Sequence, residues 1–242
     1  MTAEDWDALN AMRRAGDVAG ARELIFRGGK VSENVRDVMH KPSSSFDGRS
    51  VLHYLAMTAL PRSERDSRLH ELIVLLRELV DVHGADVNRA DSMGSTPLHI
   101  ATMVNSSKLD DDSFWSLAIV QVMLDAGADS DPIAQDGVTP LAWAIYAHFS
   151  SRTKARAGCV ELLLDCGANL NRAKAYLKGL PPWVEDLVKQ RRENAGKAVV
   201  TVLGIKRFGR SHVMNSNAKD VIRLIADQIW LDRYNPAWKP PT

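Results

Sequence analysis

Histidine and cysteine are the side chains most often used as metal ligands, bases and nucleophiles, and this 242-residue chain has seven histidines and two cysteines. The histidines are scattered along the sequence and do not have the spacing of a metal-binding pair. Cys159 and Cys166 are seven residues apart, which is too far for a metal-binding pair and does not suit a disulfide. We therefore expect both to be reduced thiols of an intracellular protein.

The acidic triplet Asp110–Asp112 is a second candidate, because carboxylates bind cations. The Gly and Glu of a calcium-binding loop do not follow it, so we expect Asp112 or Ser113 to cap a helix instead. The chain also has no glycine-rich phosphate loop, no Gly-x-Ser-x-Gly and no His-Glu-x-x-His motif. The sequence thus predicts no catalytic residue, no metal and no cofactor. An enzyme without a recognisable motif is the alternative.

Charge is balanced over the whole chain but uneven along it. The formal net charge is +1, which predicts no global attraction to nucleic acid or membrane. Residues 1–171 carry 17 basic and 24 acidic side chains, whereas residues 172–215 carry 10 and 3. The basic segment has two interpretations: contact with nucleic acid, or a solvated face that complements the acidic residues.

The N-terminal residues have no basic start followed by an apolar stretch, and no apolar run is long enough to span a bilayer. We therefore expect no membrane insertion and a cytoplasmic or nuclear location.

Two motifs recur along the chain and indicate the elements that position its side chains. Gly-Ala followed by Asp or Asn ends apolar runs at residues 84–88, 127–131 and 167–171, and a second motif opens apolar runs at 47–53, 94–99 and 137–142. Gly84 precedes Gly94 by ten residues, and Gly127 precedes Gly137 by the same distance. Self-similarity at a regular offset is typical of stacked repeat proteins.

Local chemistry predicts where the helices of each repeat begin and end. Thr96 and Thr139 precede Pro-Leu, so their hydroxyls can cap helices in which proline occupies the first turn. Gly127 and Gly167 are expected to end helices in the left-handed conformation. The ten residues from one motif's Gly to the next motif's Gly hold Asp, Asn and Ser in place of a long apolar alternation, which favours a protruding hairpin-like turn over a sheet strand.

This pattern resembles the ankyrin repeat, in which a helix, a turn, a second helix and a hairpin-like loop follow one another. The motifs that carry the resemblance are Thr-Pro-Leu-His and Gly-Ala-Asp-Val-Asn. The resemblance covers a degenerate N-terminal cap at about 3–34 and full units at about 46–88, 91–131 and 136–171. It implies an all-α solenoid with short hairpin loops in residues 1–175, followed by a helical C-terminal cap or docking segment in residues 176–242. Gly48 and Gly94 are 46 residues apart and Gly94 and Gly137 are 43, against about 33 in the family, so we expect longer helices or polar loops within the units.

The resemblance also implies the roles of particular residues. In ankyrin repeats the histidine of Thr-Pro-Leu-His bonds neighbouring backbone, which assigns His53 and His99 to structure. Recognition uses the hairpin tips and the exposed side of each first helix, which form a concave surface. The matching positions are Phe46, Asp47, Arg49, Met57, Thr58, Ser92, Met93, Ser95, Met103, Val104, Gln135, Asp136, Val138, Tyr146 and Ala147.

Apolar residues are frequent at these positions. They predict an adaptor or scaffold that binds a protein or peptide. Burial of the same side chains within a bent stack is the alternative. We interpret Trp115, Trp143 and Trp183 as core or interface residues rather than base-stacking platforms.

After Asn171 the motif is lost and a different helical unit is expected. Pro181–Pro182 predicts a helix that continues to Leu203, and residues 217–230 predict another. One interpretation is a cap that covers the apolar face of the last repeat. Another is a resemblance to a SOCS-box or F-box, which would make the chain the substrate-recognition subunit of a ubiquitin ligase, although Asn215–Asn217 stands where Leu-Pro is expected.

Overall fold

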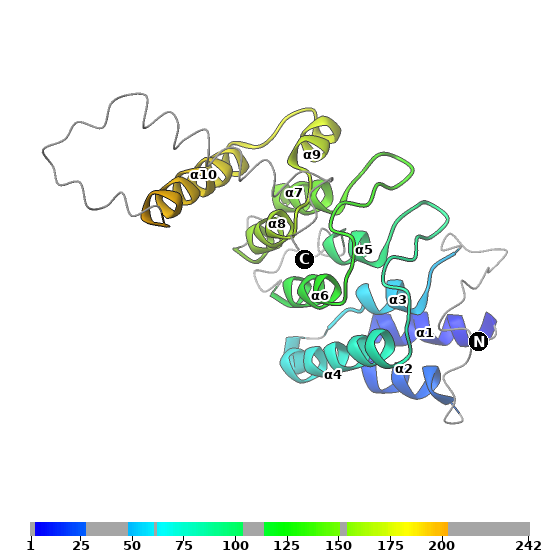
Figure 1. The fold of residues 1–242 in the computed structure, drawn as a ribbon. Helices are drawn as coiled ribbons and strands as arrows, with labels where there is room; N and C mark the ends of the chain where they lie inside the picture. The colour runs from blue at the N-terminus through cyan, green and yellow to red at the C-terminus, as the bar shows by residue number, and fades with distance from the viewer. Residues whose placement is uncertain (1–2, 28–47, 61, 104–113, 151–153, 203–242) are drawn as a thin grey trace, which may run out of the picture. The chain divides into compact units, whose positions relative to one another are not determined.

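The computed structural model describes residues 3–27, 48–60, 62–103, 114–150 and 154–202 (Figure 1). Within these ranges the chain forms helices and connecting loops and no strand, so the all-α class predicted from the sequence is confirmed. Two compact units make up the chain, Met1–Ala168 and Asn169–Thr242.

The first unit is a stack of helix pairs in two layers. The pairs are α1 (Ala3–Ala15) with α2 (Val18–Ile25), α3 (Val51–Ala56) with α4 (Arg65–Arg77), α5 (Pro97–Met103) with α6 (Phe114–Asp125), and α7 (Pro140–Ser150) with α8 (Lys154–Asp165). The first helices pack in the order α1, α3, α5, α7, and the second helices pack in the order α2, α4, α6, α8 (Figure 1). Each pair thus contacts mainly the pair before it and the pair after it, as in a solenoid.

Leucine and isoleucine side chains fill the space between the two layers. Fully buried examples come from successive pairs: Leu9, Leu55, Leu72, Leu98, Ile119, Leu141 and Leu163. Burying one such side chain stabilises the fold by roughly 1.5–3 kcal/mol. Every pair therefore contributes to one continuous core.

The second helix of the second pair is longer than α4 alone. A 3₁₀ turn, η3 (Arg62–Glu64), precedes α4, and a π-helix, η4 (Glu78–Val82), continues it. This extension accounts for part of the extra length expected in that unit. The polar loops expected within the next two units correspond to residues 105–112 and 150–156, and residues 105–112 and 151–153 lie outside the described residues.

The predicted helix boundaries are found in the stack. α7 begins directly after Thr139, whose Oγ1 accepts a hydrogen bond from the N–H of Ala142 at 3.2 Å. α5 begins directly after Thr96. Gly127 and Gly167 follow α6 and α8 with φ of 84° and 92°, the left-handed conformation that ends a helix at low cost when the residue is glycine.

The second unit begins with two helices, α9 (Leu170–Leu177) and α10 (Pro182–Val202). The helix predicted at Pro181–Pro182 is confirmed as far as Val202. The sequence did not predict α9, which starts inside the last Gly-Ala motif because Asn169 Oδ1 accepts from the N–H groups of both Asn171, at 2.9 Å, and Arg172, at 3.3 Å. The helix predicted at 217–230 lies outside the described residues.

Candidate partner-binding surface

Two buried histidines tie successive repeats together. His53 Nδ1 accepts from the backbone N–H of Ser50 at 3.1 Å, so its Nε2 carries the proton and donates to the carbonyl of Ser95 at 2.9 Å. His99 repeats the arrangement one unit later, accepting from the N–H of Thr96 at 3.1 Å and donating to the carbonyl of Val138 at 3.2 Å. The structural role predicted for both rings is confirmed.

The environment of these rings keeps them uncharged. Burial lowers the pKa of His53 to about 4, and burial also lowers the pKa of His99. Both imidazoles are therefore neutral at physiological pH, and both ring nitrogens of each are used in bonds that fix the loops.

The loop tips are joined to each other by polar contacts. Arg49 Nε lies 3.3 Å from Asp91 Oδ2, and Asp91 Oδ1 accepts from the N–H groups of Met93 and Ser95, both at 2.9 Å. In the next loop, the N–H of Gln135 donates to the carbonyl of Met93 at 2.9 Å. Figure 1 shows the loops before α5 and α7 projecting from the helices side by side. The tips therefore form one connected edge of the stack.

Glycine allows this close approach. Gly94 has φ of 76°, and a Cβ at this position would lie 3.1 Å from the backbone N of Gln135. Gly48 has φ of 81°, and its Cβ would lie 2.9 Å from the backbone N of Ser92. Glycine is thus needed twice at each position, for the left-handed backbone and for the space between neighbouring tips.

A second set of contacts joins the bases of the loops. Asn88 Nδ2 donates to the carbonyl of Gly127 at 3.1 Å, and its Oδ1 accepts from the N–H of Asp129 at 2.7 Å. The hydroxyl of Ser130 donates to the carbonyl of Cys166 at 2.9 Å. Each loop is held by the repeat that follows it.

Several residues predicted from the sequence do present their side chains to solvent. Met93 is 60% exposed and Tyr146 is 51% exposed. The side chains of Ser92, Gln135 and Asp136 are also exposed, and those of Arg49, Ser95 and Met103 are half-buried. Phe46, Asp47, Val104 and the side chain of Ala147 lie outside the described residues.

Three other predicted positions are not exposed. Met57 is 7% exposed because its sulfur lies 3.4 Å from Arg49 Nη1 and its carbonyl accepts from Arg13 Nη1 at 3.3 Å. Thr58 and Val138 are 2% and 1% exposed. The expectation that these three side chains face a partner is wrong, and they belong to the core.

Two further apolar residues are at least partly exposed: Trp143, which the sequence predicted only as a core or interface residue, and Ile133, which was missed. Trp143 is half-buried and contacts Tyr146 edge-on, with ring centroids 5.9 Å apart and an interplanar angle of 80°. The signal was present in the sequence, since residues three apart on a helix share a face. Ile133, in the loop before the tip, is 54% exposed. An apolar residue in an otherwise polar loop was its only indication.

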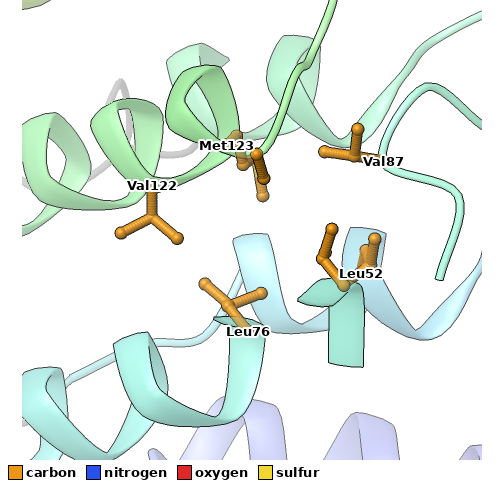
Figure 2. Close-up of a pocket in the computed structure, with 7 residues that line it drawn as sticks. Leu52, Leu76, Val87, Val122 and Met123 are labelled. Carbon is orange, nitrogen blue, oxygen red and sulfur yellow. The ribbon is translucent and has the colours of Figure 1, made fainter. Parts of the chain in front are cut away.

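A small cavity in the stack offers no chemistry. It has a volume of about 10 Å³ between the second and third helix pairs. Figure 2 shows five of the side chains around it pointing toward one another. The lining is entirely apolar: Leu52, Leu76, Val80, Val87, Val122, Met123 and Ala126. It is a packing defect between repeats rather than an active site.

Metal-binding and thiol chemistry receive no support from the geometry either. In the described part of the chain, no three His, Cys, Asp or Glu side chains gather as a metal ion would require. Cys159 is buried, and burial raises the pKa of Cys166, so that thiol is protonated at neutral pH. None of the helices in the described ranges is both long enough and apolar enough to cross a membrane.

Comparison with known families agrees with the two-layer stack. Residues 75–174 match the family model for ankyrin repeats in three copies. The remainder of the chain is assigned to no other family. No curated protein matches the sequence.

Proposed function

From the ankyrin repeats of residues 75–174 we infer that the chain is an adaptor or scaffold, without catalysis of its own, that binds a protein or peptide. Ankyrin repeats generally mediate protein–protein interaction. The binding site we propose is called the tip surface. It consists of the exposed or half-buried side chains of Ser92, Met93, Met103, Gln135, Asp136, Trp143 and Tyr146.

The observation that carries the proposal is that large apolar side chains, Met103 half-buried and Tyr146 exposed, occupy corresponding places in the third and fourth helix pairs, whereas Met57 at that place in the second pair is buried. Met103 and Tyr146 are 43 residues apart, which is the offset between Gly94 and Gly137, and they lie on the packed helices α5 and α7. Single exposed apolar residues are ordinary on protein surfaces. Their recurrence at one repeat position, beside Met93 and Trp143, is typical of a binding surface.

The rigidity of the tips supports the same proposal. The backbone of Met93 is held on both sides: its N–H donates to Asp91 Oδ1, and its carbonyl accepts from the N–H of Gln135. A partner would therefore meet a loop that is already ordered. Because less conformational entropy is lost on binding, more of the contact energy becomes affinity.

The test is a triple variant, Met93→Ala, Met103→Ala and Tyr146→Ala, in the full chain. We expect partners recovered with the wild-type protein by affinity purification and mass spectrometry to be lost, while thermal unfolding stays cooperative. A matched control is Val74→Ala with Val82→Ala, which removes side chains 42% and 72% exposed on α4 and η4. An unchanged set of partners would refute the assignment of the tip surface.

Other functions predicted from the sequence stay predictions. The resemblance to a ubiquitin-ligase box rests on residues 202–208 and the helix predicted from Asn217, and of these only Val202 is among the described residues. Nucleic-acid contact through residues 172–215 and a cytoplasmic or nuclear location are likewise predictions.

A further inference from the structure

We propose that the segment bound by the tip surface is basic, with an arginine or lysine next to an apolar residue. This inference rests on the proposed function and adds the chemistry of the partner. It follows from the charges on the loops, from the way their carboxylates are held, and from the aromatic pair on α7.

The charged side chains of the two loops beside the tip surface are almost all acidic. Neither α5 nor α7 contains Asp, Glu, Lys or Arg. The loop 127–139 contains three acidic residues and no basic one, and the loop 84–96 adds two acidic residues and one basic. These charged residues are Asp86, Arg89, Asp91, Asp129, Asp131 and Asp136.

One carboxylate of this set is already neutralised. Asp91 is 8% exposed, and Arg49 Nε lies 3.3 Å from its Oδ2. Both of its oxygens are therefore used inside the stack, where they hold the tip together. Asp91 is a structural residue and does not contribute to binding.

Asp129 and Asp136 are held differently. Asp129 Oδ1 accepts from the N–H of Asp131 at 3.0 Å, and Asp136 Oδ1 accepts from the N–H of Val138 at 3.2 Å. Both side chains are exposed, and neither forms an ion pair with a Lys or Arg of the described residues. Each bond fixes the orientation of a carboxylate and leaves its second oxygen to a ligand. Both carboxylates are thus oriented and can accept a further bond from a cationic group.

An aromatic pair follows this loop directly. α7 begins at Pro140, four residues after Asp136, and presents Trp143 and Tyr146 edge to face. A guanidinium stacks on aromatic rings and bonds a carboxylate with its planar N–H groups. An aliphatic or aromatic neighbour in the partner would pack on Met93 and Met103. Arginine fits this combination better than lysine, whose charge is more compact and more strongly hydrated.

The same charges disfavour other occupants. An acidic peptide, an anionic membrane and a nucleic acid would each bring negative charge against Asp129 and Asp136, neither of which is paired with a Lys or Arg of the described residues. Charge complementarity therefore selects a basic protein segment and speeds its approach at low salt.

The test begins with random dodecamer peptides displayed on phage and selected on the immobilised full chain. We expect the selected peptides to be enriched in Arg and Lys with apolar neighbours. A selected peptide should bind Asp129→Asn/Asp136→Asn about tenfold more weakly than wild type, as expected for the loss of one charge-assisted contact at Asp136 together with the negative charge of Asp129 at the base of the same loop. Binding should also weaken in 0.5 M NaCl.

A control variant separates local recognition from general attraction. Asp66→Asn/Glu71→Gln removes the same charge from exposed positions on α4. It should leave affinity within about twofold, since distant surface charges are screened. An equal loss in this variant would show non-specific attraction and overturn the inference.

The outcomes also distinguish this inference from the proposed function. Peptides that need Met93 and Tyr146 but show no excess of basic residues would overturn the inference and leave the proposed function standing. Peptides that are indifferent to both sets of variants would overturn both. Sedimentation experiments test a third outcome. If the full chain self-associates and Met93→Ala abolishes this, the tip surface binds a second copy of the chain, and the inference of a basic partner is overturned.

Discussion

Acidification should destabilise the repeat stack through His53. The ordinary pKa of the imidazole is 6.5, and burial lowers it to about 4 in the folded protein. The folded chain therefore binds this proton less readily than the unfolded chain does. The stabilisation by neutral His53 is fully present above pH 6.5 and is lost as the pH falls toward 4.

The size of the effect follows from these two values. Between pH 7.5 and pH 4.5, the shift in pKa removes about 2.5 kcal/mol from the free energy of unfolding. The physical reason is the ring's position: protonation of Nδ1 would break its bond from the N–H of Ser50 and place a charge in the core. Burial of His99 acts in the same direction and adds to the loss.

The assay is urea unfolding, followed by circular dichroism, at several pH values between 7.5 and 4.5. Wild type should lose about 2.5 kcal/mol more than His53→Gln over this range, because the variant has no ring to protonate and the carboxylate contributions are common to both. His70→Gln, at an exposed position of α4, should follow wild type. Parallel losses in wild type and His53→Gln would refute the reasoning.

A direct measurement guards against a His53→Gln variant that does not fold. In wild type, the ring signals of His53 in nuclear magnetic resonance spectra should stay constant between pH 7.5 and 5.5. A titration midpoint near 6.5 would contradict the buried, neutral ring.

Three further predictions concern the contacts between repeats. Gly94→Ala should destabilise the stack more than Gly137→Ala. Both residues have positive φ, which costs alanine about 1–2 kcal/mol at either position, but only a Cβ at position 94 approaches a neighbouring loop. Equal losses of unfolding free energy in urea would contradict that approach. Leu76→Ala should cost about 2.7–5 kcal/mol by enlarging the cavity, whereas Val74→Ala, at a side chain 42% exposed, should cost under about 1 kcal/mol. Asn88→Ala should lower the free energy of unfolding by about 1–2 kcal/mol and speed hydrogen exchange at the backbone N–H of Asp129, which Asn88 bonds. Unaltered exchange would show that this bond is not maintained in solution.

The sequence predicted features that depend on a few neighbouring residues. Thr139 before Pro-Leu starts a helix because its hydroxyl satisfies an N–H three residues on, and Gly127 ends one because glycine adopts the left-handed conformation. The roles of His53 and His99 were also predictable, once the repeat resemblance placed them beside the next loop. Repetition supported each of these predictions, since the same local chemistry appears in more than one unit.

Features that depend on distant residues were less predictable. Met57 was expected at the surface, but Arg13 and Arg49, 44 and 8 residues away in sequence, contact and cover it. Asn169 occupies the motif position of Asp86 and Asp129, yet it caps α9, because its Oδ1 accepts from the N–H groups of Asn171 and Arg172. A local pattern cannot show which neighbour will cover a side chain.

Capping and turn formation are local, so the repeat class and the helix ends at Thr96, Thr139, Gly127 and Gly167 could be predicted from the sequence alone. Which side chains of each loop remain exposed depends on the packing of neighbouring repeats. The carboxylate of Asp91 pairs with Arg49 and bonds N–H groups of its own loop, so it has a structural role. Asp136, two residues before the buried Val138, stays exposed and without a cation partner among the described residues. The physical reason is the stacking itself, since the repeat packed on either side decides which polar groups are already satisfied and which remain for a partner.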